Sequence, residues 1–202
     1  MKLYYKSGAC SLSPHIVLLE AGLPFALEAV NLGTKVTDSG ADYRTINSKG
    51  SVPALQLDDG RVLTEGPAVV QYIADQKPGS GLAPPAGSFE RYQLMELLNF
   101  ISSEVHKSFS PLFNPATPAD GKAAAKENLK KKFTWLDGYL GSKPYLMGET
   151  FTVADAYLFT MLSWTPRVGV DLAEHPRLTA YMARVAARPK VQEALKAEGL
   201  MQ

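Results

Sequence analysis

A segment rich in proline and glycine divides the sequence into two halves with different patterns. Residues 78–88 contain Pro78, Gly79, Gly81, Pro84, Pro85 and Gly87. This composition suits an extended linker and disfavours both helix and strand. We therefore predict a first domain over residues 1–77, a linker over 78–88 and a second domain over 89–202.

The first domain begins with a strand, a loop and a helix. Residues 2–5 are typical of a short strand, and Ser13 followed by Pro14 indicates a helix start with a capping hydroxyl before the proline. Gly22 is expected to end that helix. Residues 25–31 alternate as a second strand, which a helical crossover should place parallel to the first.

The rest of this domain is predicted to hold a hairpin and two further helices. Residues 41–46 indicate a short helix, and 54–57 with 61–64 flank the turn sequence of an antiparallel hairpin. Gly66 and Pro67 then open a helix with a 3.6-residue period. The expected order is strand, helix, strand, helix, strand, strand, helix.

The second domain is predicted to be entirely helical, because its apolar residues recur with a helical period. The expected helices cover residues 89–107, 119–140, 153–165, 176–187 and 189–197. The fold class is thus a two-domain chain, with an α/β domain followed by an all-α domain.

Charge and hydropathy exclude several classes of partner. The 21 Lys and Arg residues nearly balance 20 Asp and Glu, and a net charge of +1 gives no general attraction to nucleic acid or acidic membranes. No apolar run approaches the roughly 20 residues that span a bilayer. The opening residues lead directly into a strand pattern and not into a secretory segment, so we expect a cytoplasmic protein.

Cys10, the single cysteine of the chain, is the strongest candidate for a reactive group. It lies where the first strand passes into the first helix, and backbone N–H groups at such a junction lower the pKa of a thiol. The alternative is a buried cysteine that acts as a small apolar residue. Residues 10–13 form a C-x-x-S pattern, so oxidised Cys10 would have to pair with a thiol from another molecule.

Four segments in order resemble bacterial beta-class glutathione transferases. They are MKLYYKSGACSLSPHIVLLEAGL, GSVPALQLDDGRVLTEGPAVVQYIAD, RYQLMELLNFISSEVHKSF and YLMGETFTVADAYLF. The resemblance spans essentially the whole chain. It implies a thioredoxin-like first domain, a homodimer, and glutathione as a co-substrate with no tightly bound cofactor.

The resemblance also implies glutathione-binding residues in the first domain. Val52 precedes a proline, Pro53, that the resemblance implies is cis, so that the Val52 backbone pairs with the cysteinyl unit of glutathione. Glu65 would face the γ-glutamyl ammonium. The Gly66 N–H would bind a carboxylate, although many members of the class carry serine where this chain has Gly66. Lys35 would pair with the glycyl carboxylate. From the residues alone, Pro53 could simply open a strand, Glu65 could cap a helix and Lys35 could be solvated.

A polar stripe on the helix at residues 89–107 supplies further candidates. Asn99, Ser103 and His106 follow an i, i+4, i+7 spacing that places them on one helix face. The opposite, apolar face holds Leu94, Leu98, Ile101 and Val105. Such stripes are usually solvated, but the resemblance implies that Asn99, Ser103 and Glu104 reach glutathione on the other subunit. It places His106 and Lys107 near the glutathione sulfur.

Two mechanisms remain open for an enzyme of this kind. In conjugation, the glutathione thiolate attacks an aromatic or halogenated electrophile in the cleft between the domains, while Cys10 donates a hydrogen bond, with Ser11 or His106 as further donors. In thiol transfer, Cys10 itself attacks a glutathione mixed disulfide. Glutathione-dependent peroxidase and dehalogenase activities belong to the same hypothesis. The alternative from another class is a non-catalytic carrier of hydrophobic ligands on the same fold.

Three other features are interpreted as structural. Thr152 and Asp155 have the spacing of a capping box, with Phe151 as a hydrophobic staple. His15 and His175 have no cysteine or carboxylate at ligand spacing, so no metal site is expected.

Overall fold

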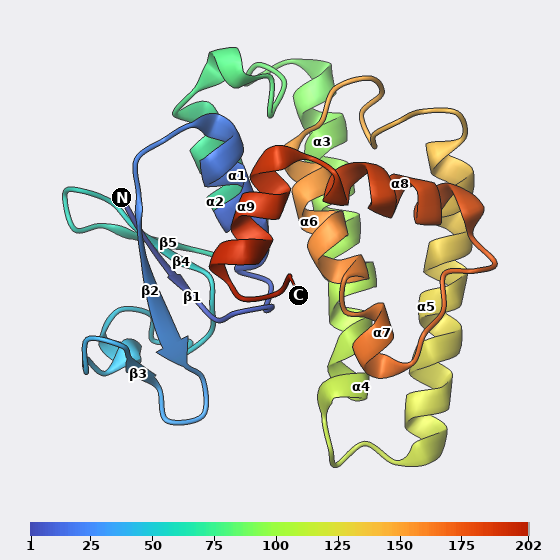
Figure 1. The fold of residues 1–202 in the computed structure, drawn as a ribbon, viewed down its shortest axis with the longest axis horizontal. Coiled ribbons are helices and arrows are strands. Elements are labelled where there is room, and N and C mark those ends of the chain that lie inside the picture. Colours follow the sequence, from blue (N-terminus) through green and yellow to red (C-terminus); the bar gives the residue numbers. More distant parts are fainter. Residues whose placement is uncertain (202) are drawn as a thin grey trace. The chain divides into compact units, whose positions relative to one another are not determined.

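The computed structural model describes residues 1–201. Its contacts divide the chain into two compact units (Figure 1), the first made of residues 1–83 together with the segment from Ala187 onward, and the second of residues 84–186. The C-terminal segment therefore packs with the N-terminal half, whereas the sequence pattern grouped it with the preceding helices. The expected division into a domain over residues 1–77, a linker over 78–88 and a domain over 89–202 stays a prediction.

The first unit is built on a five-stranded mixed sheet with the order β3-β2-β1-β4-β5. Its strands are β1 Lys2–Tyr5, β2 Ala26–Asn31, β3 Val36–Thr37, β4 Ala54–Gln56 and β5 Val62–Thr64. β1 is parallel to β2, as expected from the helical crossover, and antiparallel to β4. The predicted hairpin of β4 and β5 is confirmed, and the very short β3 was not foreseen.

The helices of this unit are α1 Leu12–Ala21, α2 Gly66–Asp75 and α9 Pro189–Ala197, with 3₁₀ turns at Tyr43–Thr45 and Pro78–Ser80. Helix α1 packs against both α2 and α9. It ends at Gly22, whose φ of 64° is the left-handed conformation that glycine adopts most easily. It begins at Leu12, earlier than predicted, so Ser13 lies within the helix and its hydroxyl donates to the Cys10 carbonyl instead of capping the helix.

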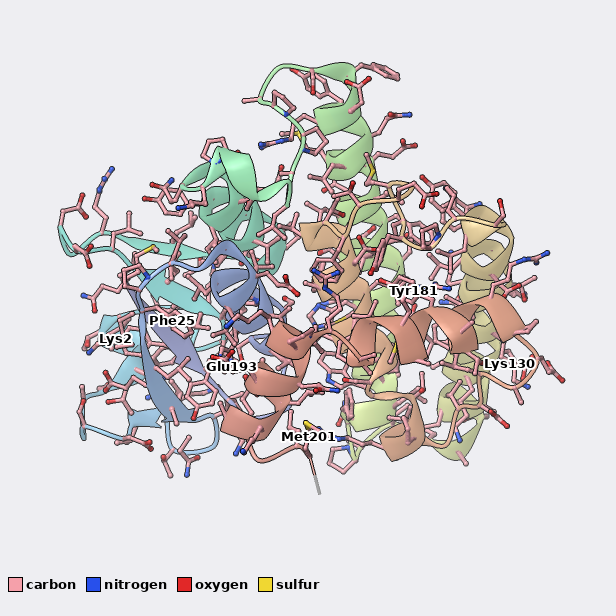
Figure 2. The ribbon with its side chains drawn as sticks, turned by 45° about the horizontal axis from the view of Figure 1, so that its top comes forward. Lys2, Phe25, Lys130, Tyr181, Glu193 and Met201 are labelled. Carbon is pink, nitrogen blue, oxygen red and sulfur yellow. The ribbon has the colours of Figure 1, made fainter. Side chains whose placement is uncertain are left out.

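The second unit contains only helices in the part that the structure describes. They are α3 Phe89–Phe100, α4 Ser110–Phe113, α5 Ala119–Leu140, α6 Val153–Leu162, α7 Thr165–Val168 and α8 Pro176–Ala186. All ten residues of α6 are buried, which makes it the central helix of the unit. In Figure 2, Tyr181 of α8 lies within this bundle and Lys130 of α5 lies at its outer edge.

The predicted capping box at the start of α6 is confirmed. The Asp155 carboxylate accepts hydrogen bonds from the backbone N–H and the hydroxyl of Thr152 at 2.8 and 2.9 Å, and from the Leu146 N–H at 2.8 Å. Burial raises the pKa of Asp155 to about 6. No helix within residues 1–201 combines the length and apolarity needed to cross a bilayer.

The segment predicted as a helix over residues 89–107 is helical throughout, but its period is not that of one regular α-helix. Helix α3 ends at Phe100, a π-helix follows over Ile101–His106, and a 3₁₀ turn covers Lys107–Phe109. Because a π-helix holds more residues per turn than an α-helix, it changes which side chains share a face beyond Phe100. This matters for the candidate site.

Candidate active site

Cys10 lies in the tight loop that joins β1 to α1. The Ser11 hydroxyl accepts from the Lys6 N–H at 3.1 Å and donates to the Lys6 carbonyl at 3.2 Å, and the Ala9 N–H donates to that carbonyl at 2.9 Å. These bonds fix the backbone on both sides of the cysteine. Ser11 is itself buried, and its hydroxyl is used within the loop.

The thiol of Cys10 faces a carbonyl on a segment 42 residues away. Its Sγ donates to the Val52 carbonyl at 3.1 Å. The Val52–Pro53 peptide is cis, as the resemblance implied. Val52 is held in a buried cluster with Tyr4, Val30, Tyr43 and Ala54. The structure therefore brings Cys10, Val52 and Pro53 together as one constellation.

The pKa of Cys10 is shifted in the direction opposite to the expectation. Burial raises it to about 11, outweighing the backbone N–H groups of Cys10 and Ser11, which favour the thiolate, and the Glu65 carboxylate raises it further. The helix-start donors are thus present as expected, but desolvation of the charged form is the larger effect. Near neutral pH the group is a protonated thiol. The residue as a whole is partly buried.

A buried pair of hydrogen-bonded side chains, Glu198 and His15, supports the loop from the C-terminal segment. One oxygen of Glu198 lies 2.9 Å from Nδ1 of His15, and the other accepts from the Gly8 N–H at 2.9 Å. The Ser7 hydroxyl donates to the Glu198 carbonyl at 2.6 Å. Sequence reasoning missed Glu198, because no local pattern links residues 190 positions apart.

Glu65 stands directly before helix α2 with its carboxylate exposed. Its φ of 71° lies in the left-handed region, which is uncommon for residues other than glycine and often marks functional positions. The side chain makes no capping hydrogen bond, so Glu65 does not cap α2 through its carboxylate. It pairs instead with Lys49, whose Nζ lies 2.6 Å from Oε1. Lys49 was also missed by sequence reasoning.

Gly66 and Lys35 complete the predicted set in the first unit. Gly66 is the first residue of α2, where backbone N–H groups have no acceptor within the helix. Lys35 has a φ of 61°, and its Nζ donates to the Gly50 carbonyl at 2.8 Å. It is therefore anchored and not simply solvated.

The remaining predicted residues lie in the second unit. Asn99, Ser103 and Lys107 are exposed, and the Ser103 hydroxyl donates to the Asn99 carbonyl at 3.0 Å. Glu104 pairs with Lys132 at 2.6 Å. These side chains follow one another along the exposed edge of the helix.

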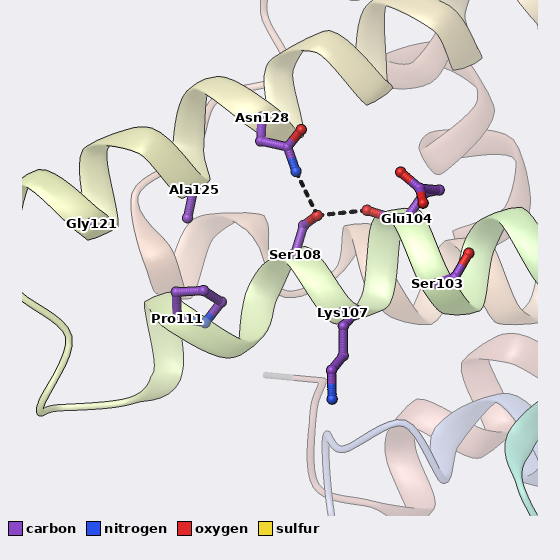
Figure 3. A pocket seen from close by; sticks show the side chains of 8 residues that line it. All are labelled: Ser103, Glu104, Lys107, Ser108, Pro111, Gly121, Ala125 and Asn128. Carbon is purple, nitrogen blue, oxygen red and sulfur yellow. Dashed lines mark hydrogen bonds between the residues drawn. The ribbon is translucent and has the colours of Figure 1, made fainter.

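A cavity of about 370 Å³ opens beside this edge (Figure 3). It is lined by Ser103, Glu104, Lys107, Ser108, Pro111, Gly121, Ala125 and Asn128. Within it the Ser108 hydroxyl donates to the Glu104 carbonyl at 2.6 Å and accepts from Asn128 at 2.9 Å. Lys107 points away from Asn128. The cavity wall thus combines polar side chains that are hydrogen-bonded to one another with the apolar Pro111 and Ala125.

His106 does not share the exposed face of Asn99 and Ser103, contrary to the expected spacing. The π-helix turns it inward, where Nδ1 lies 2.8 Å from the Tyr157 hydroxyl and the ring meets Trp164 edge-on at 5.1 Å. Trp164 also contacts Phe109 and Phe113 at ring distances of 5.4 and 5.3 Å. His106 therefore belongs to an aromatic cluster.

Comparison with known proteins assigns this architecture. The family description "Glutathione S-transferase, N-terminal domain" matches residues 8–76, and "Glutathione S-transferase, C-terminal domain" matches residues 100–189. The chain is 48% identical to glutathione S-transferase GstA of Escherichia coli O157:H7 over 99% of this chain and 100% of that protein. The chain belongs to the glutathione S-transferase family.

Two solved structures refine the assignment within the family. The bacterial beta-class glutathione S-transferase of Sphingomonas chungbukensis is 49% identical, with a TM-score of 0.97 and full coverage of both chains. A sphingomonad glutathione S-transferase complexed with glutathione is 51% identical, with a TM-score of 0.96 and full coverage of both chains. The beta class and the thioredoxin-like fold are thereby confirmed. The N-terminal family match contains Cys10, Val52 and Glu65.

Proposed function

We propose that this protein joins glutathione to small aromatic or halogenated electrophiles, with Cys10 at the centre of the reaction. The observation that carries the proposal is the position of Cys10, at the start of α1 and 3.1 Å from the Val52 carbonyl, in a chain of the glutathione S-transferase family. Relatives bearing that name and the sphingomonad structure with glutathione support the choice of co-substrate.

Cys10 acts in this reaction as a hydrogen-bond donor. With a pKa of about 11 it is protonated near neutral pH, so when glutathione binds its S–H can turn from the Val52 carbonyl to the glutathione sulfur and stabilise the thiolate there. The thiolate then forms a bond to the electrophilic carbon, and the leaving group departs with its electron pair. The thiol proton of glutathione passes to solvent.

Glutathione itself is proposed to bind along the first unit. Val52 offers its backbone to the cysteinyl unit, Glu65 accepts from the γ-glutamyl ammonium, and the Gly66 N–H binds a carboxylate. Lys35 pairs with the glycyl carboxylate, and Ser11 holds the loop that presents Cys10. Each assignment uses a group whose charge or hydrogen-bonding capacity complements the ligand.

The second unit is proposed to supply the remaining contacts. In a homodimer, Asn99, Ser103 and Glu104 are proposed to reach glutathione bound to the partner, which the exposed positions of Asn99 and Ser103 and the partly buried position of Glu104 support. Lys107 and His106 are proposed to act on the glutathione sulfur. The cluster of His106, Phe109, Phe113 and Trp164 suits an aromatic second substrate, because ring edges and faces pack favourably with aromatic ligands.

Thiol–disulfide transfer is a second candidate function, favoured by the backbone N–H groups of Cys10 and Ser11, which stabilise a thiolate. A substrate panel separates the candidates. The protein is assayed with glutathione and a chloronitrobenzene, a chlorinated aliphatic compound, a hydroperoxide or a glutathione mixed disulfide. Conjugation of the chloro compounds at higher turnover than the others is expected. Turnover of the mixed disulfide alone would favour transfer, and no turnover with tight binding of hydrophobic ligands would favour the carrier alternative.

A further inference from the structure

Lys49 makes the ion pair that occupies one oxygen of Glu65. Its Nζ lies 2.6 Å from Glu65 Oε1 and donates to the Thr64 hydroxyl at 2.7 Å. The ammonium is thereby placed over the two residues that precede helix α2. Because both partners are adjacent in sequence, the position of this charge is defined even though its side chain is half exposed.

The backbone of Lys49 is also fixed. Its N–H donates to the Asn47 side chain at 3.1 Å, and the Gly50 N–H donates to the Asn47 carbonyl at 2.8 Å. Asn47 and Tyr43 both donate to the Ser51 carbonyl, at 2.7 and 2.8 Å. A buried tyrosine and asparagine therefore hold the turn from which the lysine extends, and the side chain reaches Glu65 from a rigid base.

Hydrogen-bonding capacity remains on both members of the pair. An ammonium has three donors, and within residues 1–201 Lys49 uses two of them, on Thr64 and Glu65. Glu65 contacts the lysine through Oε1, which leaves Oε2 as an acceptor. The pair thus presents one cationic donor and one anionic acceptor side by side at the start of a helix.

We propose that Lys49 and Glu65 together form a clamp for an α-amino acid group, in which Lys49 binds the α-carboxylate and Glu65 the α-ammonium of the γ-glutamyl residue. The inference rests on the proposed use of glutathione and adds Lys49 as a specificity-determining residue. A ligand that carries an ammonium and a carboxylate on one carbon can bind both Glu65 and Lys49. A ligand with only one of these groups can bind only one of the two side chains. Neither side chain has to break the existing ion pair.

Calorimetric titration with three thiols tests this assignment. Glutathione carries both charges, glutaryl-cysteinyl-glycine lacks the ammonium, and 4-aminobutyryl-cysteinyl-glycine lacks the α-carboxylate. For Lys49→Met we expect Kd to rise roughly 3- to 10-fold for glutathione and for the glutaryl compound, the range of one ordinary hydrogen bond, because the Lys49 side chain is half exposed. For the aminobutyryl compound Kd should be unchanged or lower. Lys49→Arg should restore glutathione binding, because it keeps the cation.

Lys77→Met, at an exposed lysine of the same unit, is the matched control and should leave all three Kd values unchanged. An unchanged or lower Kd of Lys49→Met for glutathione would overturn the clamp, as would an equal rise for the aminobutyryl compound. If the wild type binds glutathione and Lys49→Met binds it with the same Kd, the clamp is contradicted and the proposed function is not. If the wild type binds none of the three thiols, the proposed function is contradicted as well.

Discussion

Nδ1 of His15 lies 2.9 Å from the carboxylate of Glu198, so two residues 183 positions apart form a buried pair beside the loop that carries Cys10. The same carboxylate accepts from the Gly8 N–H. This contact explains why the end of the chain packs with its beginning. It also makes the C-terminal segment part of the support for the candidate active site.

Removing the Glu198 carboxylate should therefore destabilise the protein. For Glu198→Ala we expect a loss of about 3 kcal/mol in the free energy of unfolding, because the substitution removes a buried acceptor that contacts both His15 and the Gly8 N–H. Denaturant unfolding measures the change. Glu193→Ala is the control, since its pair with Lys190 is exposed and should contribute less than about 1 kcal/mol. Equal effects of the two substitutions would contradict the role of Glu198.

Alkylation of Cys10 should be slow near neutral pH. Only the thiolate reacts with iodoacetamide, and a pKa raised to about 11 from the ordinary value of 9.0 reduces its fraction roughly 100-fold. The rate should rise with pH, reach half its maximum near pH 11 and level off above that. The chain has one cysteine, so the reaction reports on Cys10 alone. A rate at neutral pH equal to or above that of a model thiol would show that burial does not control this group.

Glu65 should account for much of the stabilisation by glutathione. Ligand binding raises the melting temperature by mass action, and Glu65→Ala should remove most of that rise by deleting the acceptor for the γ-glutamyl ammonium. Glu28→Ala is a useful comparison in the same unit, because it removes an ion pair with Lys2 on the sheet. That variant should melt lower but keep the shift. A full shift in Glu65→Ala would exclude Glu65 from the site.

The exposed pair Asn99 and Ser103 should affect binding and leave the fold unchanged. The double alanine variant is expected to weaken glutathione binding roughly tenfold, the effect of losing one to two hydrogen bonds to a ligand. Circular dichroism should match the wild type, since both side chains are exposed. Sedimentation of the wild-type protein reports the dimer. A native monomer that binds glutathione normally would contradict the contact across subunits.

Much of this fold could be predicted from local sequence signals. Gly22 ends α1 with a positive φ, and Thr152 with Asp155 starts α6, because a turn glycine and a capping box act through neighbouring residues. The predicted bounds 119–140 and 189–197 coincide with α5 and α9. These elements depend on spacing and caps, which the sequence displays directly.

The features that escaped prediction depend on tertiary context. The π-helix over Ile101–His106 changed the face of His106, although the apolar positions Leu98 and Val105 fitted a regular helix. The direction of the Cys10 pKa shift depends on burial, which a helix-start argument does not include. Glu198 and Lys49 were missed because their partners are distant in sequence. Such contacts form only when separate elements pack together.

The central claim is that Cys10 serves conjugation as a donor and not as a covalent nucleophile. Conjugation of glutathione with a chloronitrobenzene in wild type, Cys10→Ser and Cys10→Ala tests it most directly, with kcat/KM as the readout. A serine hydroxyl still donates, so Cys10→Ser should keep activity within about tenfold of wild type, while Cys10→Ala should lose about 100-fold or more, as when an oxyanion donor is removed. Equal, severe losses in both variants would show that the sulfur itself is required and would contradict the donor role of Cys10.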